Sequence, residues 1–166
     1  MLRTLIDPRL PAWLPDALRS LLRVVTGALF MQHGAQKLFG LLLAPDRTWN
    51  GAPELFTQMW FAGVLEFFGG ALIVLGLLTR PVAFVLAGQM AVAYFMAHAP
   101  RSFWPVLNGG EHTALFSFIF LYLAAAGPGR FSVDGALLGG RGRTSTPTDG
   151  SRSRTGDGRA ADTRAA

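Results

Sequence analysis

Long apolar stretches, separated by short polar segments, fill most of the chain between residues 20 and 127. A helix that crosses the hydrocarbon of a bilayer needs about 20 predominantly apolar residues. Four segments approach this requirement, at about residues 20–43, 59–78, 81–98 and 108–127. The pattern therefore predicts an all-α fold, a transmembrane four-helix bundle within residues 1–138.

The second and third predicted spans carry very little charge. The segment "MWFAGVLEFFGGALIVLGLL" contains Glu66 as its only charged residue, and Thr79 and Arg80 alone separate it from the next span. Pro81 suits the first turn of a helix, because that position needs no backbone N–H. Two such runs joined by so short a connection favour membrane insertion over the buried helices of a soluble protein.

Polar residues mark the ends of the first and fourth predicted spans. Arg19 and Arg23 lie at the start of the first span, where we expect them to snorkel toward the headgroups. Residues 113–127 are too short to cross a bilayer on their own. We therefore extend the fourth span outward to Asn108, so that "NGGEH" opens the helix and Glu111 lies in its first turn. The helix dipole favours an anion at that position.

Seven polar side chains are predicted to converge on the outer half of the bundle. In "MQHGAQKLFG" (residues 31–40), polar positions three and four residues apart share one face of the helix. Since a charge in hydrocarbon costs at least about 2.5–3.5 kcal/mol, such groups are expected to face one another. The candidate ligand-binding residues are His33, Gln36, Lys37, Glu66, His98, Glu111 and His112.

Lys37 and Glu66 are predicted to form an ion pair, with Glu111 sharing the lysine. Two alternatives stay open: Lys37 could extend to the outer headgroups, and Glu66 could serve as a ligand or proton site. Histidines can ligate haem or a metal. Unless two histidines face each other at the same depth in the membrane, we predict that they form hydrogen bonds and bind neither haem nor a metal. Gln89 is expected to hydrogen-bond between helices in the inner half, facing away from His98.

The composition agrees with a lipid environment. Hydrophobic residues make up 51% of the 166 residues and charged residues 15%, against roughly 25% charged in a typical soluble domain. Thirteen phenylalanines and four tryptophans are typical of lipid contact and of the membrane interface. The absence of cysteine excludes disulfides, thiolate metal sites and dithiol redox chemistry in this chain.

The net charge of +5 is concentrated in the C-terminal segment. Residues 141–166 hold six arginines and three aspartates, which contribute +3, but no aromatic residue that could stack on a base. We therefore expect residues 139–166 to form a disordered, Arg-rich cytoplasmic tail, and we expect no nucleic-acid partner. The excess of arginine on one side of the spans predicts a multi-pass membrane protein with both termini cytoplasmic.

Several motifs resemble those of the DoxX family of bacterial four-helix inner-membrane proteins. They are "FMQHGAQKLFG", "GVLEFFGGALIVLGLLTRPVA", "MAVAYFMAHAP" and "NGGEHTALFSFIFLYLAAAGPGRFSVD", and together they cover about residues 21–135. The resemblance implies a bacterial inner (plasma) membrane location. The DoxX-like group is similar to the membrane subunit of thiosulfate:quinone oxidoreductase. The resemblance therefore also implies an association with redox homeostasis and with oxidative-stress enzymes. The recurring polar positions that it implies are His33, Lys37, Glu66, His98 and Glu111.

Three functions remain open at this point. The first is an accessory subunit of a membrane redox or oxidative-stress assembly without catalytic activity of its own, because the chain has no complete catalytic constellation. The second is a quinone-binding subunit of an oxidoreductase, in which a histidine and a carboxylate exchange protons with a quinone oxygen. The third is a transporter of small solutes or protons through the polar cluster, for which four short helices leave little room unless the protein forms a homo-oligomer.

Overall fold

The computed structural model describes residues 11–139, and within that range it contains helices and connecting turns but no strand. The helices are α2 (Leu14–Phe39), α3 (Gln58–Val64), η1 (Leu65–Gly69), α4 (Gly70–Leu75), α5 (Thr79–Ala93), η2 (Tyr94–His98), α6 (Pro105–Asn108), α7 (Glu111–Ala126) and α8 (Val133–Gly139). The elements η1 and η2 are π-helical turns. The Arg-rich tail predicted for residues 139–166 lies outside the described residues, apart from Gly139.

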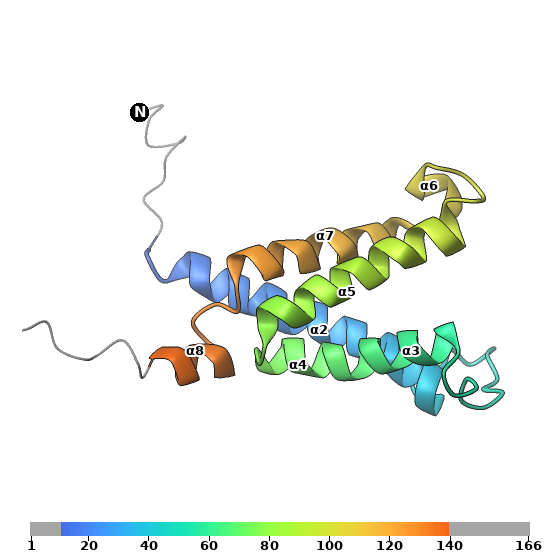
Figure 1. Cartoon of the computed structure of the whole chain (residues 1–166), viewed down its shortest axis with the longest axis horizontal. Helices are drawn as coiled ribbons and strands as arrows, with labels where there is room; N and C mark the ends of the chain where they lie inside the picture. Colours follow the sequence, from blue (N-terminus) through green and yellow to red (C-terminus); the bar gives the residue numbers. More distant parts are fainter. Residues whose placement is uncertain (1–10, 140–166) are drawn as a thin grey trace, which may run out of the picture.

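Four helical segments lie side by side over most of their length (Figure 1). Because α3, η1 and α4 follow one another without a break, as do α5 and η2, each series forms one long segment. α2 packs along α3, η1 and α4, whereas α5 packs along α7. Successive segments run in opposite directions, so α6 and the loop of residues 40–57 lie at one end and α8 at the other (Figure 1). We call these the α6 end and the α8 end.

Glycines allow α2 to approach its neighbouring segment closely. A Cβ atom at Gly34 would lie 2.8 Å from the carbonyl oxygen of Gly63 and 2.8 Å from the Cα of Phe67. A Cβ atom at Gly70 would lie 2.8 Å from the backbone nitrogen of Met31. Small residues of this kind permit tight contact between helices in membranes. The contact determines how the side chains of α2 meet those of η1.

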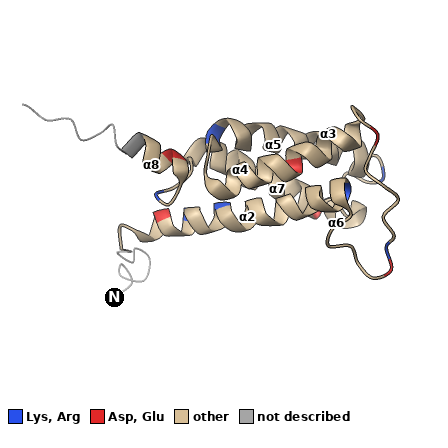
Figure 2. Ribbon diagram, turned by 90° about the horizontal axis from the view of Figure 1, so that it is seen from below, with Lys and Arg blue, Asp and Glu red and all other residues tan. Residues whose placement is uncertain are grey.

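The buried core is apolar and joins all four segments. Its largest fully buried members are Phe30, Ile73, Leu86, Phe120 and Leu123. Many other large apolar side chains are exposed on the outer surfaces of the segments, and charged residues are sparse along the helices between the two ends (Figure 2). A helical body that is apolar both inside and outside is typical of membrane spans.

Two continuous segments, Gln58–Leu75 and Thr79–His98, are long and apolar enough to cross a membrane. α7 is apolar as well, but it has 16 residues and so extends roughly 24 Å. The structure therefore contains helices at all four predicted positions. Of these, Gln58–Leu75 and Thr79–His98 have both the length and the apolar composition that a membrane span requires.

Two of the helices differ from the predicted spans. α2 begins at Leu14, well before residue 20, and ends at Phe39, because Gly40 adopts a left-handed φ of 63° and caps the helix. The "NGGEH" segment does not open one continuous helix. Gly109, with a φ of 69°, separates α6 from α7, which begins at Glu111.

Candidate functional site

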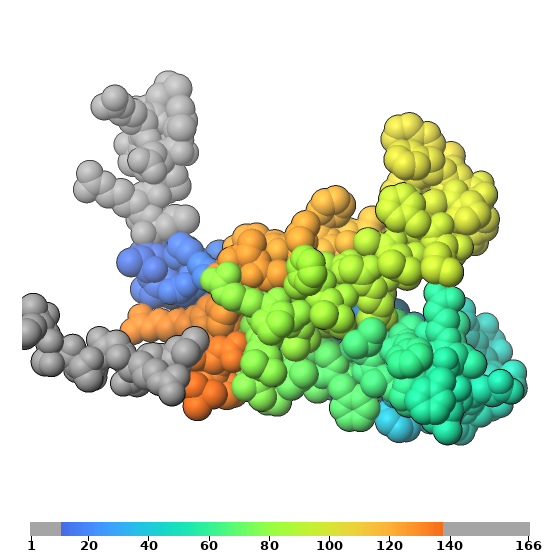
Figure 3. Space-filling view, viewed as in Figure 1, coloured from blue at the N-terminus to red at the C-terminus, as the bar shows by residue number. Residues whose placement is uncertain are grey.

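A cavity of about 920 Å³ lies toward the α6 end. In this region α3 diverges from the segment of α5 and η2 (Figure 1), and the space-filling view shows a hollow between them (Figure 3). Side chains from α2, from α3 with η1, from α5 with η2 and from α7 line it, and most of them are apolar. The structure brings five of the seven predicted site residues to this cavity, namely His33, Lys37, Glu66, His98 and His112. It does not bring Gln36 or Glu111 there.

Glu66 lies in the π-helical turn η1 and is only 2% exposed. Lys37 from α2 donates a hydrogen bond from Nζ to Glu66 Oε1 at 2.5 Å. The predicted ion pair is therefore present, and it holds the Lys37 ammonium against the carboxylate of Glu66. π-helical turns interrupt the regular helical hydrogen-bond pattern and are frequent at functional sites.

Gln89 from α5 completes this group of polar side chains. Its Nε2 donates to Glu66 Oε1 and to the carbonyl oxygen of Ala62, each at 3.4 Å. The expected interhelical hydrogen bond is present, but the expected position is wrong, because Gln89 lies beside Glu66 and lines the same cavity as His98. The ideal helical period places Gln89 and His98 on opposite faces. The π-helical turn η2 changes the angle between successive residues, so that His98 lies on the same side of the helix as the cavity.

Two buried acceptor atoms of this group have no hydrogen-bond partner among residues 11–139. They are Glu66 Oε2 and Gln89 Oε1. An unpaired buried acceptor costs about 1–3 kcal/mol. Buried polar atoms without partners deserve an explanation, and a bound ligand that donates hydrogen bonds is one.

The histidines of the cavity are held separately. His98 lies with Nδ1 at 3.2 Å from the carbonyl oxygen of Asn108 and with Nε2 at 3.3 Å from Thr113 Oγ1. His33 packs edge-on against Phe116, with 6.3 Å between the ring centroids. Within the described part of the chain, no three histidine, aspartate or glutamate side chains form a group that could hold a metal ion.

Gln36 and Glu111 are placed away from the cavity. Gln36 donates from Nε2 to the carbonyl oxygen of Leu42 at 2.8 Å, which ties the end of α2 to the following turn. Glu111 is exposed at the first residue of α7 and forms no ion pair with any residue between 11 and 139. The expectation that Glu111 shares Lys37 is therefore wrong. The break at Gly109 leaves its carboxylate at the exposed start of a helix, away from the Lys37–Glu66 pair.

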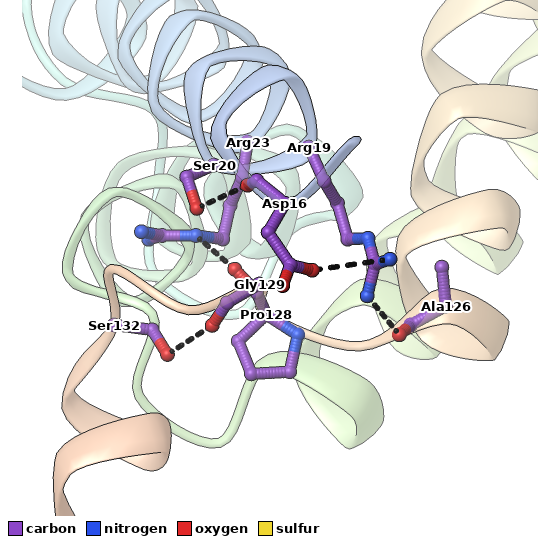
Figure 4. A network of polar contacts seen from close by, with 8 residues as sticks. All are labelled: Asp16, Arg19, Ser20, Arg23, Ala126, Pro128, Gly129 and Ser132. Carbon is purple, nitrogen blue, oxygen red and sulfur yellow. Dashed lines mark hydrogen bonds and ion pairs between the residues drawn. The ribbon is translucent and has the colours of Figure 1, made fainter. Parts of the chain in front are cut away.

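A second polar group, which was not predicted from the sequence, lies at the α8 end and is centred on Arg23 (Figure 4). Arg23 is 1% exposed. It donates from Nη1 to the carbonyl oxygens of Ile73 at 2.5 Å and Val74 at 2.6 Å, and from its other nitrogens to those of Phe131 at 2.6 Å and Pro128 at 2.9 Å. The expected snorkelling of Arg23 is therefore wrong. Carbonyl groups at the end of a helix lack partners within it, and Arg23 supplies donors to those of α4.

Other charged side chains at the α8 end also bind helix termini. Arg80 donates to the carbonyl oxygens of Ala124 and Ala125, and Arg19 donates to that of Ala126 (Figure 4), all in the last turn of α7. Cations favour this end of a helix. The signal available in the sequence was the position of Arg19, Arg23 and Arg80 close to the ends of the predicted spans.

Asp134 of α8 binds the opposite kind of terminus, the start of α5. Its two carboxylate oxygens accept hydrogen bonds from the backbone N–H groups of Leu78 at 2.9 Å and Thr79 at 2.8 Å. Burial by itself would raise the pKa of Asp134, but these hydrogen bonds and the charge of Arg23 hold the pKa below its ordinary value. α8 is therefore attached to the helical body through an ionised carboxylate.

The apolar outer surface and the two long apolar segments define the class of protein, an all-helical membrane protein. The chain belongs to the DoxX family. The sequence model of that family matches residues 18–99, a range that contains His33, Lys37, Glu66, Gln89 and His98.

Two bacterial proteins are similar to the chain over most of their own length. An uncharacterized protein of Haemophilus influenzae is 38% identical over 118 residues, which cover 68% of this chain and 85% of that protein. An uncharacterized membrane protein of Mycobacterium tuberculosis is 28% identical over 132 residues, which cover 70% of this chain and 78% of that protein. No solved structure matches the chain.

Proposed function

We propose that the chain is a multi-pass protein of the bacterial inner membrane, in which the four helical segments cross the bilayer as a bundle with both termini in the cytoplasm. Four arginines, Arg19, Arg23, Arg80 and Arg130, belong to the α8 end. An excess of arginine and lysine beside the spans favours the cytoplasmic side. The α6 end, with the cavity, then faces the periplasmic side.

The natural absence of cysteine makes this topology simple to test. His112 at the α6 end and Arg130 at the α8 end are both exposed. In spheroplasts, a membrane-impermeant maleimide should label His112→Cys directly and Arg130→Cys only after permeabilisation. Equal labelling of both variants in sealed spheroplasts would contradict the proposed orientation.

We propose further that the protein is an accessory subunit of a membrane redox or oxidative-stress assembly, and that its cavity holds the ring of a quinone-type lipid. The observation that carries this proposal is the buried carboxylate of Glu66, with Lys37 and Gln89 as its partly buried partners, in the wall of a mainly apolar cavity. Ionisable residues inside a membrane are functional-site candidates because they are costly to maintain. The volume of about 920 Å³ also suits a small-molecule site, since such pockets are typically about 300–1,000 Å³.

The apolar lining and the polar group suit the two parts of such a ligand. Phe30, Leu65, Met90 and Phe116 offer contact surfaces to an apolar ring. Lys37 offers a hydrogen-bond donor, and Glu66 and Gln89 offer acceptors, to the polar groups of that ring. The chain itself contains no thiol, so any dithiol step of the assembly belongs to a partner protein. This division of chemistry supports an accessory role.

The experiment is purification from native membranes in a mild detergent, followed by solvent extraction of bound lipids and mass spectrometry of co-purifying proteins. The proposal expects a quinone at a fixed ratio to the chain, together with at least one redox or oxidative-stress enzyme. Glu66→Gln should retain less quinone than the wild-type protein, while the matched control Gln36→Ala, outside the cavity, should retain as much. A wild-type protein that purifies without quinone and without such an enzyme under all gentle conditions contradicts the proposal.

A further inference from the structure

Two residues that line the cavity, Glu66 and Gln89, each carry a buried hydrogen-bond acceptor without a partner among the described residues. The amide of Gln89 is oriented by its neighbours, because Nε2 faces the carbonyl oxygen of Ala62 and Glu66 Oε1, and both of these atoms are acceptors. Oε1 is therefore the unpaired atom of that amide. Glu66 binds Lys37 through Oε1 and leaves Oε2 unpaired among the described residues.

We propose that this site binds the reduced, dihydroxy form of an aromatic ring in preference to the oxidised, dicarbonyl form. The inference rests on the proposed function and specifies which form of the ligand the site selects. A hydroxyl group can donate to Glu66 Oε2 or Gln89 Oε1, whereas a ring carbonyl is only an acceptor and leaves both atoms unpaired. A site arranged to bind a hydroxyl hydrogen rejects an analogue that lacks one.

The donors near the cavity do not reverse this preference. The Lys37 ammonium has hydrogens beyond the one that it shares with Glu66, and His33 also lines the cavity. Either group can donate to a ring carbonyl. A hydroxyl oxygen accepts hydrogen bonds as well, so these donors serve both forms of the ring. The two acceptor atoms, Glu66 Oε2 and Gln89 Oε1, can bind only the reduced form. They therefore account for the expected difference in affinity between the two forms.

The rim of the cavity suits a ligand with a hydrophobic tail. The rim residues that are about half exposed are Met59, Phe61, Val85, Val92 and Met96. They belong to the two segments that are long and apolar enough to cross a membrane. Gln58 Nε2 donates to Met96 Sδ at 3.4 Å and so connects α3 to η2 at this rim. A tail leaving between these segments would lie among lipid chains while the ring contacts Glu66.

The test is equilibrium binding to the full chain in lipid nanodiscs, with a benzoquinone that carries a ten-carbon tail, used in its oxidised form and, under anaerobic conditions, in its reduced form. The reduced form should bind about tenfold more tightly, because one additional hydrogen bond to a buried acceptor corresponds to a factor of this order. Glu66→Gln and, separately, Gln89→Leu should bring the ratio of the two dissociation constants toward one. The control Gln36→Ala should leave the ratio unchanged.

The outcomes separate this inference from the function on which it rests. If the wild-type protein binds the oxidised form as tightly as the reduced form, or more tightly, the preference is wrong while quinone binding stands. If the folded wild-type protein binds neither form, the proposed quinone ligand itself fails. The two dissociation constants of the wild-type protein decide whether the site prefers the reduced form, even if a variant does not fold.

Discussion

Arg23 toward the α8 end and Glu66 toward the α6 end are both almost fully buried, with 1% and 2% exposure. Arg23 donates four hydrogen bonds to carbonyl oxygens of the α4 end and of the segment after α7. Glu66 has one charged partner and an amide neighbour, and its second oxygen is unpaired among residues 11–139. Burial alone therefore does not distinguish these two charges. The number of satisfied polar atoms does.

The two surroundings differ for a physical reason. The partners of Arg23 are backbone carbonyls, which a helix end must offer in any case. Those of Glu66 are side chains from two different helices at the wall of a cavity. The Arg23 group therefore holds segments together, whereas the Glu66 group is arranged around a space. The following changes test this distinction, in order of decreasing expected effect.

Arg23→Met should be the most damaging substitution. It removes the donor to the carbonyls of Ile73, Val74, Pro128 and Phe131, and hydrogen bonds to a charged group contribute about 1.5–3 kcal/mol each when their partner is lost. We expect a loss of about 4 kcal/mol or more in the free energy of unfolding, measured by thermal denaturation in detergent. Arg23→Lys should not restore it, because an ammonium lacks the planar fork of donors. Arg130→Ala, at an exposed position, is the control, and equal melting of Arg23→Met and Arg130→Ala would refute the structural role.

Gly34→Ala should separate the two halves of the ion pair. The added Cβ would lie 2.8 Å from the carbonyl oxygen of Gly63, so α2 must move away from η1, at a cost of about 3 kcal/mol. The same shift draws Lys37 away from Glu66. The matched control is Gly88→Ala on α5, where a Cβ meets no atom within 4 Å. Thermal denaturation of both variants should place Gly34→Ala far below wild type and Gly88→Ala at or above it.

Lys37→Met should destabilise the protein by about 2 kcal/mol, because Glu66 keeps a buried charge without its partner. The destabilisation that comes from the unpaired charge of Glu66 should disappear when Glu66→Gln is added, because the double variant has neither charge of the pair. A double-mutant cycle of unfolding free energies measures the coupling. Strictly additive single substitutions would mean that the two side chains do not interact in the membrane.

Asp134→Asn should have the smallest effect, about 1 kcal/mol, because it weakens a cap at the start of α5. The pKa of Asp134 is below its ordinary value in the folded protein, so its contribution is complete above the ordinary carboxyl pKa of about 4 and is lost as the pH falls through the folded value. The difference in melting temperature between wild type and variant should therefore shrink below about pH 4. Asp46→Asn in the exposed loop should show no such pH dependence.

Much of the cavity could be predicted from the sequence, because apolar runs determine which residues share the membrane and helical spacing determines which side chains share a face. The Lys37–Glu66 pair follows from that reasoning and is present. Gln89 was misplaced because the π-helical turn η2 changes the phase between it and His98. A uniform helical period contains no signal for such a turn.

The Arg23 group could not be predicted in the same way. Its partners are backbone carbonyls, which every residue possesses, so no residue type marks them. They become recognisable only when the chain is folded and a helix end lies beside α2. The expectation for Glu111 failed for a related reason, since the helix break at Gly109 depends on a left-handed backbone conformation.

The most direct test of the central claim is photolabelling of the full chain in membranes with an azido-substituted quinol, followed by mass spectrometric identification of the labelled residues. The account predicts attachment to cavity-lining positions on α3 with η1 and on α5 with η2, such as Leu65 and Met90, with labelling suppressed by excess unlabelled quinol. Attachment confined to outward-facing residues such as Phe118, or to residues around Arg23, would contradict it.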